Sequence, residues 1–268
     1  MTILSIARAQ PAVRWAAGGW MFFILENAVL SENRTWIIEQ LGDDQYHAVY
    51  GTFSTIATAS IGYTYYRIRK GPMDPALRLW TKRLPPTPAA AGFVFLSMGL
   101  AMATQTLPKL QIPFALVNPD ASAGPAPANA SWNLQVRCPF DFAHGKNQDG
   151  SALHGLERIS RHPGLWSFGL IGLGQAMMAS SIPLQIWWTG PVAIAWLGGA
   201  HTDSRFRRGM GGTLDPRYDA ETSNVPFAAM LTGRQGSDSM RKMMEEGKPL
   251  NAAVAILASG LWVARRIR

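Results

Sequence analysis

Residues 164–200 form the most restrictive stretch of the sequence, because they contain two long apolar segments and no charged side chain. The segments cover residues 164–181 and 184–200, so only Ile182 and Pro183 separate them. A helix of about 18 apolar residues is long enough to cross the hydrocarbon core of a bilayer. Backbone groups have no water to bond to at that depth, so spanning elements are helices or closed barrels. The pattern therefore predicts an all-α integral membrane protein.

Four further segments have a similar character, which gives one membrane bundle of about six transmembrane helices. The chain is 47% hydrophobic and only 16% charged, whereas soluble domains carry about a quarter of charged residues. The expected spans are residues 13–30, 48–66, 89–107, 164–181, 184–200 and 249–264. A single membrane domain, residues 1–268, then has two long extramembrane connections, residues 108–163 and 201–248.

The distribution of charge predicts the topology of the six spans. Basic residues follow the second expected span, at Arg67, Arg69 and Lys70, and they also end the chain. The first connection, in contrast, is acidic. The positive-inside rule then places both termini on the cytoplasmic or stromal face. This reading also accounts for the net charge of +8, so nucleic acid is not an expected partner.

The long connections hold three further features. Asn118–Ser131 is rich in Pro, Ala, Ser and Gly and is typical of a surface loop rather than a domain. Val225–Met230 is an apolar patch that could lie at the membrane interface as a short amphipathic piece. The single Cys138 excludes an internal disulfide and any cysteine-based metal site, so an inert thiol is expected there.

Polar residues inside the expected spans are the first candidates for a functional site. Glu26 and Asn27 lie near the end of the first span, where facing the headgroups is the simpler explanation. Gln175 lies in the middle of the fourth span, with Gly172 and Gly174 beside it, and is either a helix–helix contact or a cofactor contact. We expect Gly169, Gly172 and Gly174 to mark a close helix contact on this span. Serine and threonine recur from Thr52 to Ser60 in the second span. We expect these hydroxyls to bond back to their own helix or to pack a helix interface.

The histidines lie outside the middle of every expected span. His162 precedes Pro163 and should start a helix, with proline at the first helical position. His201–Arg205 follow the fifth span, at the same face of the bilayer. We therefore expect a hydrogen-bonded cluster of Arg161, His162, Asp203 and Arg205, the alternative being two unconnected, solvated helix ends.

Three segments carry a family resemblance. They read HGLERISRHP from His154 to Pro163, WLGGAHTDSR from Trp196 to Arg205, and VPFAAMLTGRQ from Val225 to Gln235. With Leu41, Gly42, Tyr46, Tyr50 and Ser54 in the N-terminal half, they closely resemble 15-cis-zeta-carotene isomerase, which belongs to the wider NnrU-like membrane family. The similarity covers most of the chain in the same order, except for the Asn118–Ser131 loop.

The resemblance implies a haem b held by two histidines, one in the first span and one in the span after the His-Pro motif. The matching positions here are Asn27 and Gln175, and a family cysteine matches Gly172. Amide oxygens are poor axial ligands for haem iron, although they suit a hard cation such as the magnesium of chlorophyll. No haem and no other bound metal are therefore expected. If the pocket survives without its metal, Asn27, Gln175 and Gly172 should face one another across a narrow gap.

These observations favour a non-catalytic relative of the isomerase that contacts pigment or lipid and is docked on a larger, photosynthetic membrane complex. Chlorophyll or carotenoid is then the expected cofactor class, with Asn27, Gln175 and His162 as contacts. The resemblance implies a plastid location, in the thylakoid or the inner envelope. The alternative is an active 15-cis-zeta-carotene isomerase with an unusual haem ligand set. A transporter is disfavoured, because the fourth and fifth spans offer almost no polar path.

Overall fold

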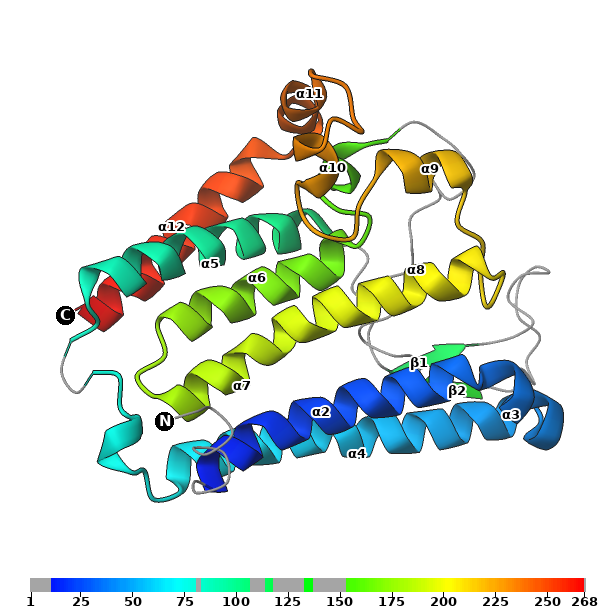
Figure 1. The fold of residues 1–268 in the computed structure, drawn as a ribbon, viewed down its shortest axis with the longest axis horizontal. Coiled ribbons are helices and arrows are strands. Elements are labelled where there is room, and N and C mark those ends of the chain that lie inside the picture. The colour runs from blue at the N-terminus through cyan, green and yellow to red at the C-terminus, as the bar shows by residue number, and fades with distance from the viewer. Residues whose placement is uncertain (1–10, 81–82, 107–113, 118–132, 137–152, 268) are drawn as a thin grey trace, which may run out of the picture.

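The computed structural model describes residues 11–80, 83–106, 114–117, 133–136 and 153–267. Long helices dominate these residues and lie side by side in a row (Figure 1). Contacts between neighbours give the order α12, α5, α6, α7, α2, α4 across the row. Helices α2 and α4 are neighbours that run in opposite directions. The last residues of α4 and α12 lie at the same end of the bundle, which is the left side of Figure 1. The all-α class predicted from the sequence is therefore confirmed.

The bounds of the elements are as follows: α2 Pro11–Glu32, α3 Arg34–Leu41, α4 Asp43–Lys70, the 3-10 turn η1 Pro75–Leu77, α5 Pro86–Thr106, β1 Phe114–Val117, β2 Asn133–Val136, the 3-10 turn η5 Gly155–Arg158, α6 Pro163–Met177, α7 Ile182–Ala193, the π-helical turn η6 Ile194–Gly198, α8 Gly199–Arg207, α9 Pro216–Glu221, α10 Ala228–Leu231, α11 Ser239–Glu246 and α12 Pro249–Ile267.

Each of the six apolar segments expected from the sequence is largely or wholly helical in the structure. Among the described helices, two are long and apolar enough to cross a membrane by length and composition, namely α5 and α12. Helices α6 and α7 are shorter, with 15 and 12 residues, whereas α2 and α4 contain charged residues. Helix α4, for example, is 28 residues long and begins with Asp43 and Asp44.

The helix that contains residues 184–200 is longer than the sequence suggested. Helices α7 and α8 join through η6, so the chain stays helical from Ile182 to Arg207. Pro191 lies inside α7, where it removes one backbone donor. The π-helical turn follows three residues later, and such turns insert an extra residue into a helix. The polar residues from His201 onward therefore continue this helix and do not end it.

Helix α6 approaches two neighbours closely through its glycines, as predicted. A Cβ atom at Gly172 would lie 2.7 Å from the Cβ of Pro191 in α7. A Cβ atom at Gly174 would lie 2.8 Å from the backbone nitrogen of Leu96 in α5. Since real Cβ atoms do not approach that closely, these positions admit only glycine unless the helices separate. The glycine face is therefore a helix contact, and it holds α6 between α5 and α7.

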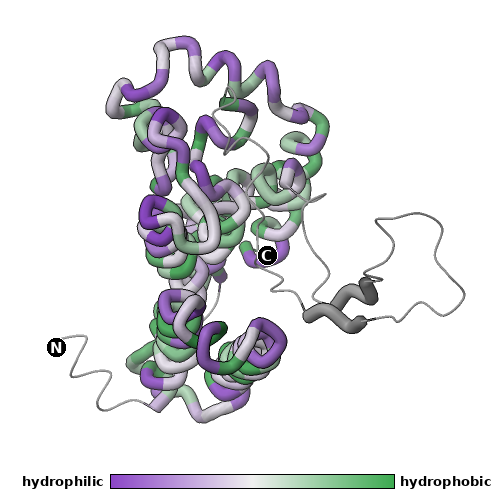
Figure 2. Tube along the Cα trace, turned by 90° about the vertical axis from the view of Figure 1, so that its right-hand side faces the viewer, coloured by the Kyte–Doolittle hydropathy of each residue, from purple (hydrophilic) through white to green (hydrophobic). Residues whose placement is uncertain are grey.

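The structure describes parts of both long connections. In the first connection, β1 and β2 form an antiparallel pair, with Phe114 opposite Val136. The Asn118–Ser131 loop and Cys138 lie outside the described residues. In the second connection, a residue with left-handed backbone interrupts the apolar patch at Val225–Met230, whose position at a membrane interface stays a prediction. Phe227 has a φ of 62°, and α10 begins only after it. In Figure 2 many residues of the uppermost segment, which is the α10–α11 region of Figure 1, are hydrophilic.

The α6–α7 contact gives a first prediction. We expect Gly172→Ala to lower the unfolding free energy by about 1–3 kcal/mol, because overpacking shifts a rigid proline ring and a backbone carbonyl. Gly18→Ala in α2 is the matched control, since its Cβ atom would meet nothing within 4 Å. Thermal unfolding of the purified protein in detergent measures both. Equal stability of the two variants would contradict the close packing.

Candidate functional site

A buried polar cluster joins the start of α6 to α8. His162 lies just before the first residue of α6, and its Nε2 atom is 2.8 Å from Oδ1 of Asp203. The guanidinium of Arg161 donates to Oδ2 of the same carboxylate at 3.2 Å. All three side chains are more than nine-tenths buried. The predicted cluster is confirmed for these residues, which we call the His-Pro corner.

Arg161 extends the corner to α9. It pairs with the carboxylate of Asp219 and donates to the backbone carbonyls of Asp219 and Thr222, at 3.1 and 2.9 Å. The hydrogen bond from Arg207, with the charge of Arg161, lowers the pKa of Asp219 to about 2. This carboxylate is therefore ionised throughout the neutral range, and the corner is a closed set of ion pairs.

Arg205, the fourth residue expected in the corner, lies elsewhere. A Cβ atom at Gly211 would lie 3.1 Å from its Nη2 atom, so the side chain points toward the loop after α8. His201, four residues earlier, lies 2.8 Å from the hydroxyl of Ser31 in α2. The polar residues of α8 therefore serve two different contacts, one with α6 and one with α2.

Two of the segments that carry the family resemblance meet at this corner. The backbone N–H of Phe227 donates to the carbonyl of Ile159 at 2.8 Å, and Gln235 donates to the carbonyl of Arg158 at 3.1 Å. The amide of Asn224 accepts from the indole of Trp166 and donates to the carbonyl of Trp196. These bonds hold the two segments together beside the start of α6.

A second ion pair, which sequence reasoning missed, fixes α11 beside this corner. Arg158 donates to both carboxylate oxygens of Glu246, at 3.0 and 2.7 Å. This contact lowers the pKa of Glu246 to about 2. The partners are separated by 88 residues, so spacing along the chain gave no signal for the pair.

Asn27 belongs to a separate polar cluster between α2 and α4. Its amide donates to Glu26 at 2.7 Å and accepts from the hydroxyl of Tyr50 at 2.8 Å. The other oxygen of Glu26 accepts from Ser54 at 3.0 Å. Glu26 is buried, so it faces α4 and not the headgroups. Ser54 bonds across helices, whereas Thr52 and Thr55 bond back to their own helix as expected.

Gln175 lies in a different part of the bundle. Its buried side chain lines a cavity of about 340 Å³ beside Tyr65, Trp188 and Arg266. Tyr65 is fifteen residues beyond Tyr50, the partner of Asn27, on the same helix α4. Fifteen residues correspond to about 22 Å along a helix. The structure therefore does not bring Asn27 and Gln175 together.

Gly172 also faces away from Asn27, because Pro191 and the carbonyl of Trp188 cover it. Helix α7 thus lies between this face of α6 and helix α2. A haem held by one ligand at Asn27 and one at Gln175 does not fit this arrangement, because the two positions are far apart and their amide oxygens are weak ligands for iron. Among the described residues, no group of three or more His, Cys, Asp or Glu is placed to hold a metal ion.

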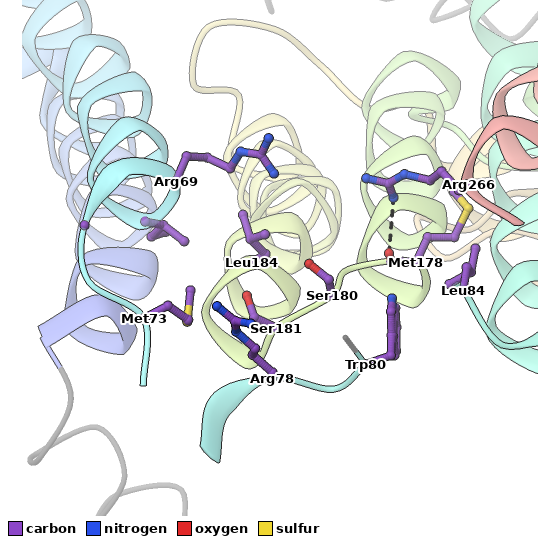
Figure 3. A pocket seen from close by; sticks show the side chains of 12 residues that line it. Arg69, Met73, Arg78, Trp80, Leu84, Met178, Ser180, Ser181, Leu184 and Arg266 are labelled. Carbon is purple, nitrogen blue, oxygen red and sulfur yellow. Dashed lines mark hydrogen bonds between the residues drawn. The ribbon is translucent and has the colours of Figure 1, made fainter. Parts of the chain in front are cut away.

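A second cavity, of about 380 Å³, adjoins the Gln175 cavity at the end of the bundle where α4 and α12 finish (Figure 3). The two share Arg69, Ser180, Leu184 and Arg266 as lining residues. Arg78 lines only the larger one. One face of this paired space is therefore basic, whereas its continuation toward Gln175 is bounded by Tyr65, Trp188 and Trp262.

The His-Pro corner gives a second prediction. Asp203→Ala removes the buried carboxylate that His162 and Arg161 both contact. We therefore expect the free energy of unfolding to fall by about 3 kcal/mol. Ser204→Ala removes an exposed side chain of the same helix and should change stability by less than about 0.5 kcal/mol. Thermal unfolding in detergent compares them, and an unchanged melting temperature for Asp203→Ala would refute a stabilising corner.

Comparison with known proteins gives one family assignment. Residues 16–264 match the family described as NnrU protein, which covers all six long helical segments. No curated protein matches the chain, and neither does any solved structure. The matched range includes the His-Pro corner and every lining residue of the two cavities except Arg266. The chain belongs to the NnrU protein family.

Proposed function

We propose that this chain is a membrane-embedded binding protein, which holds a lipid or pigment in its bundle and performs no haem chemistry. The observation that carries the proposal is the pair of adjoining cavities around Gln175 and Arg266. Arginines line both cavities, and aromatic side chains line the one at Gln175. Ligand sites in helix bundles combine apolar walls with a few polar groups that fix orientation.

The membrane location is supported by large apolar side chains on the outside of the helices. Monomeric soluble proteins rarely expose a wide apolar surface. Here such side chains lie on α2, α4 and α12, as these examples show: Met21, Leu25, Val29, Phe53, Ile56, Leu250, Leu257 and Leu261. Leu250 is 74% exposed and Leu261 is 70% exposed. Lipid chains would cover this surface in a six-span bundle.

Charged and aromatic side chains support the same topology. Helix α4 ends with Arg67, Arg69 and Lys70, and α12 ends with Arg265 and Arg266. Tyr and Trp side chains near these ends, including Tyr65, Trp188 and Trp262, are typical of the membrane–water interface.

The topology gives a third prediction. Six spans place both termini on the basic, cytoplasmic or stromal side, so tags at the two ends should show the same protease sensitivity in sealed vesicles. Detergent should then expose any tag that was protected. One protected and one sensitive tag would exclude an even number of spans.

The alternative of an active isomerase requires a haem ligand pair that the chain does not place together. A fourth prediction follows for the protein purified from its native membrane. We expect no Soret band with reducible α and β bands, and we expect lipid or pigment in the organic extract. A stoichiometric, reducible haem that supports carotene isomerisation would overturn the proposal.

The variant Asn27→His/Gln175→His sharpens this test. Tyr50 contacts Asn27 and Tyr65 lies beside Gln175, and these tyrosines are about 22 Å apart along α4. The paired histidines should therefore not bind haem through both axial sites. The single variant Gln175→His is the matched control, and the two should have the same spectrum after incubation with haem. A low-spin, two-histidine spectrum of the double variant alone would show that the helices are arranged differently.

A larger membrane complex as partner, a photosynthetic role and a plastid location stay predictions of the family resemblance. The NnrU assignment supports the scaffold, and scaffolds of one fold host different activities. The role of His162 as a ligand contact is less favoured, because the side chain is buried against Asp203.

A further inference from the structure

The basic end of the paired cavities contains three arginines from separate parts of the chain. Arg69 lies in the last turn of α4, Arg266 lies in the last turn of α12, and Arg78 lies just after η1 (Figure 3). All three line the larger cavity. Convergence of three cations from remote segments indicates a site for negative charge.

The protein supplies no such charge among the residues that the structure describes. No Asp or Glu lines either cavity. Arg69, Arg78 and Arg266 form no ion pair with any described carboxylate, although the chain forms several elsewhere. Arg266 donates instead to the backbone carbonyl of Met178 at 3.1 Å, which holds its guanidinium at the cavity wall while leaving its charge unpaired.

A hydroxyl without a partner lies in the same wall. Ser181 is only 3% exposed, and its Oγ atom has no hydrogen-bond partner among the described residues. Its backbone pairs with that of Arg78, and the N–H of Leu79 donates to the carbonyl of Ser180 at 2.9 Å. These bonds fix the hydroxyl and Arg78 beside one another. Since buried polar groups normally have partners, this hydroxyl is a further donor for an anionic oxygen.

The shape of the space beyond the arginines distinguishes a lipid from a free anion. The second cavity continues from Arg69 and Arg266 along Tyr65, Trp188 and Trp262. A free phosphate would use only the basic end. A molecule with an anionic head and an apolar tail would occupy both parts.

We propose that this site binds an anionic phospholipid, with its phosphate among Arg69, Arg78, Arg266 and Ser181 and an acyl chain along the aromatic wall. The inference rests on the proposed function, since it names the ligand of the same paired cavities. Basic pockets between spans on the positively charged side bind such headgroups, because that leaflet carries the anionic lipids.

The test uses the full chain, purified in a neutral detergent and stripped of lipid. Dioleoyl phosphatidylglycerol, dioleoyl phosphatidylcholine and inorganic phosphate are added separately, and native mass spectrometry and melting temperature report binding. We expect phosphatidylglycerol to bind and to raise the melting temperature more than the other two. Arg69→Gln/Arg78→Gln should weaken that binding about 25-fold, because each arginine contributes about fivefold.

Lys70→Gln/Arg83→Gln is the matched control, because it removes the same charge from the same end of the bundle without touching either cavity. Ser181→Ala should weaken phosphatidylglycerol binding about tenfold, with the melting temperature of the lipid-free protein unchanged. This variant keeps all positive charge, so its effect separates a built site from general attraction.

Three results would overturn the assignment of an anionic lipid. They are an equal loss of binding in the control double variant, an equal response to phosphatidylcholine, and full competition by millimolar inorganic phosphate. Extraction of membranes with alkaline carbonate tests separately whether the same variants are embedded in the membrane. It therefore distinguishes a wrong lipid assignment from a wrong proposed function. A chain that stays in the membrane but shows no lipid preference refutes only the phospholipid site, whereas a chain that is extracted refutes the membrane-embedded protein.

Discussion

Close packing of α6 against both neighbours determines where the other long helices lie. Gly174 allows the backbone of α6 to approach α5, and Gly169 and Gly172 allow it to approach α7. Helix α5 in turn contacts α12, and α7 contacts α2 through Trp20, whose ring lies against Gly190. In the membrane-embedded bundle proposed above, helices would gain little from hydrophobic attraction, so small residues that permit close contact would be a main source of their association. The order of the row follows from these contacts.

The two ends of the helical bundle differ in how their charges are paired. At one end, the His-Pro corner and the Arg158–Glu246 pair join arginines to carboxylates of the protein itself. At the other end, Arg69, Arg78 and Arg266 have no carboxylate among the described residues. Ion pairs within the protein stabilise the first end without any ligand. At the second end, the positive charges of the arginines remain available to an anionic ligand. A binding role is therefore more natural at the basic end than at the family motif.

The sequence predicted the helical class, the glycine contacts of α6 and the His162–Asp203 contact, because each depends on local pattern or on one short connection. The prediction that Asn27 and Gln175 face each other across a narrow gap was wrong. Counting positions within two helices does not show that α7 passes between them. The Arg158–Glu246 pair was missed for a similar reason, since its partners meet only through tertiary packing. The extent of the α7–α8 helix was also missed, because the polar residues after Ala200 resemble a helix end.

The π-helical turn at Ile194–Gly198 has a consequence for how the family can vary in length. Each residue added to or removed from a helix rotates everything after it by about 100°. The turn absorbs one extra residue and so sets the direction in which Asp203 points, nine residues after the turn begins. A relative that lacks one residue here and has a regular helix would keep the same side of α8 toward the start of α6. A relative of the same length with a regular helix would turn α8 by about 100°, so it should carry the acidic partner of the histidine one position away, or lack the pair altogether.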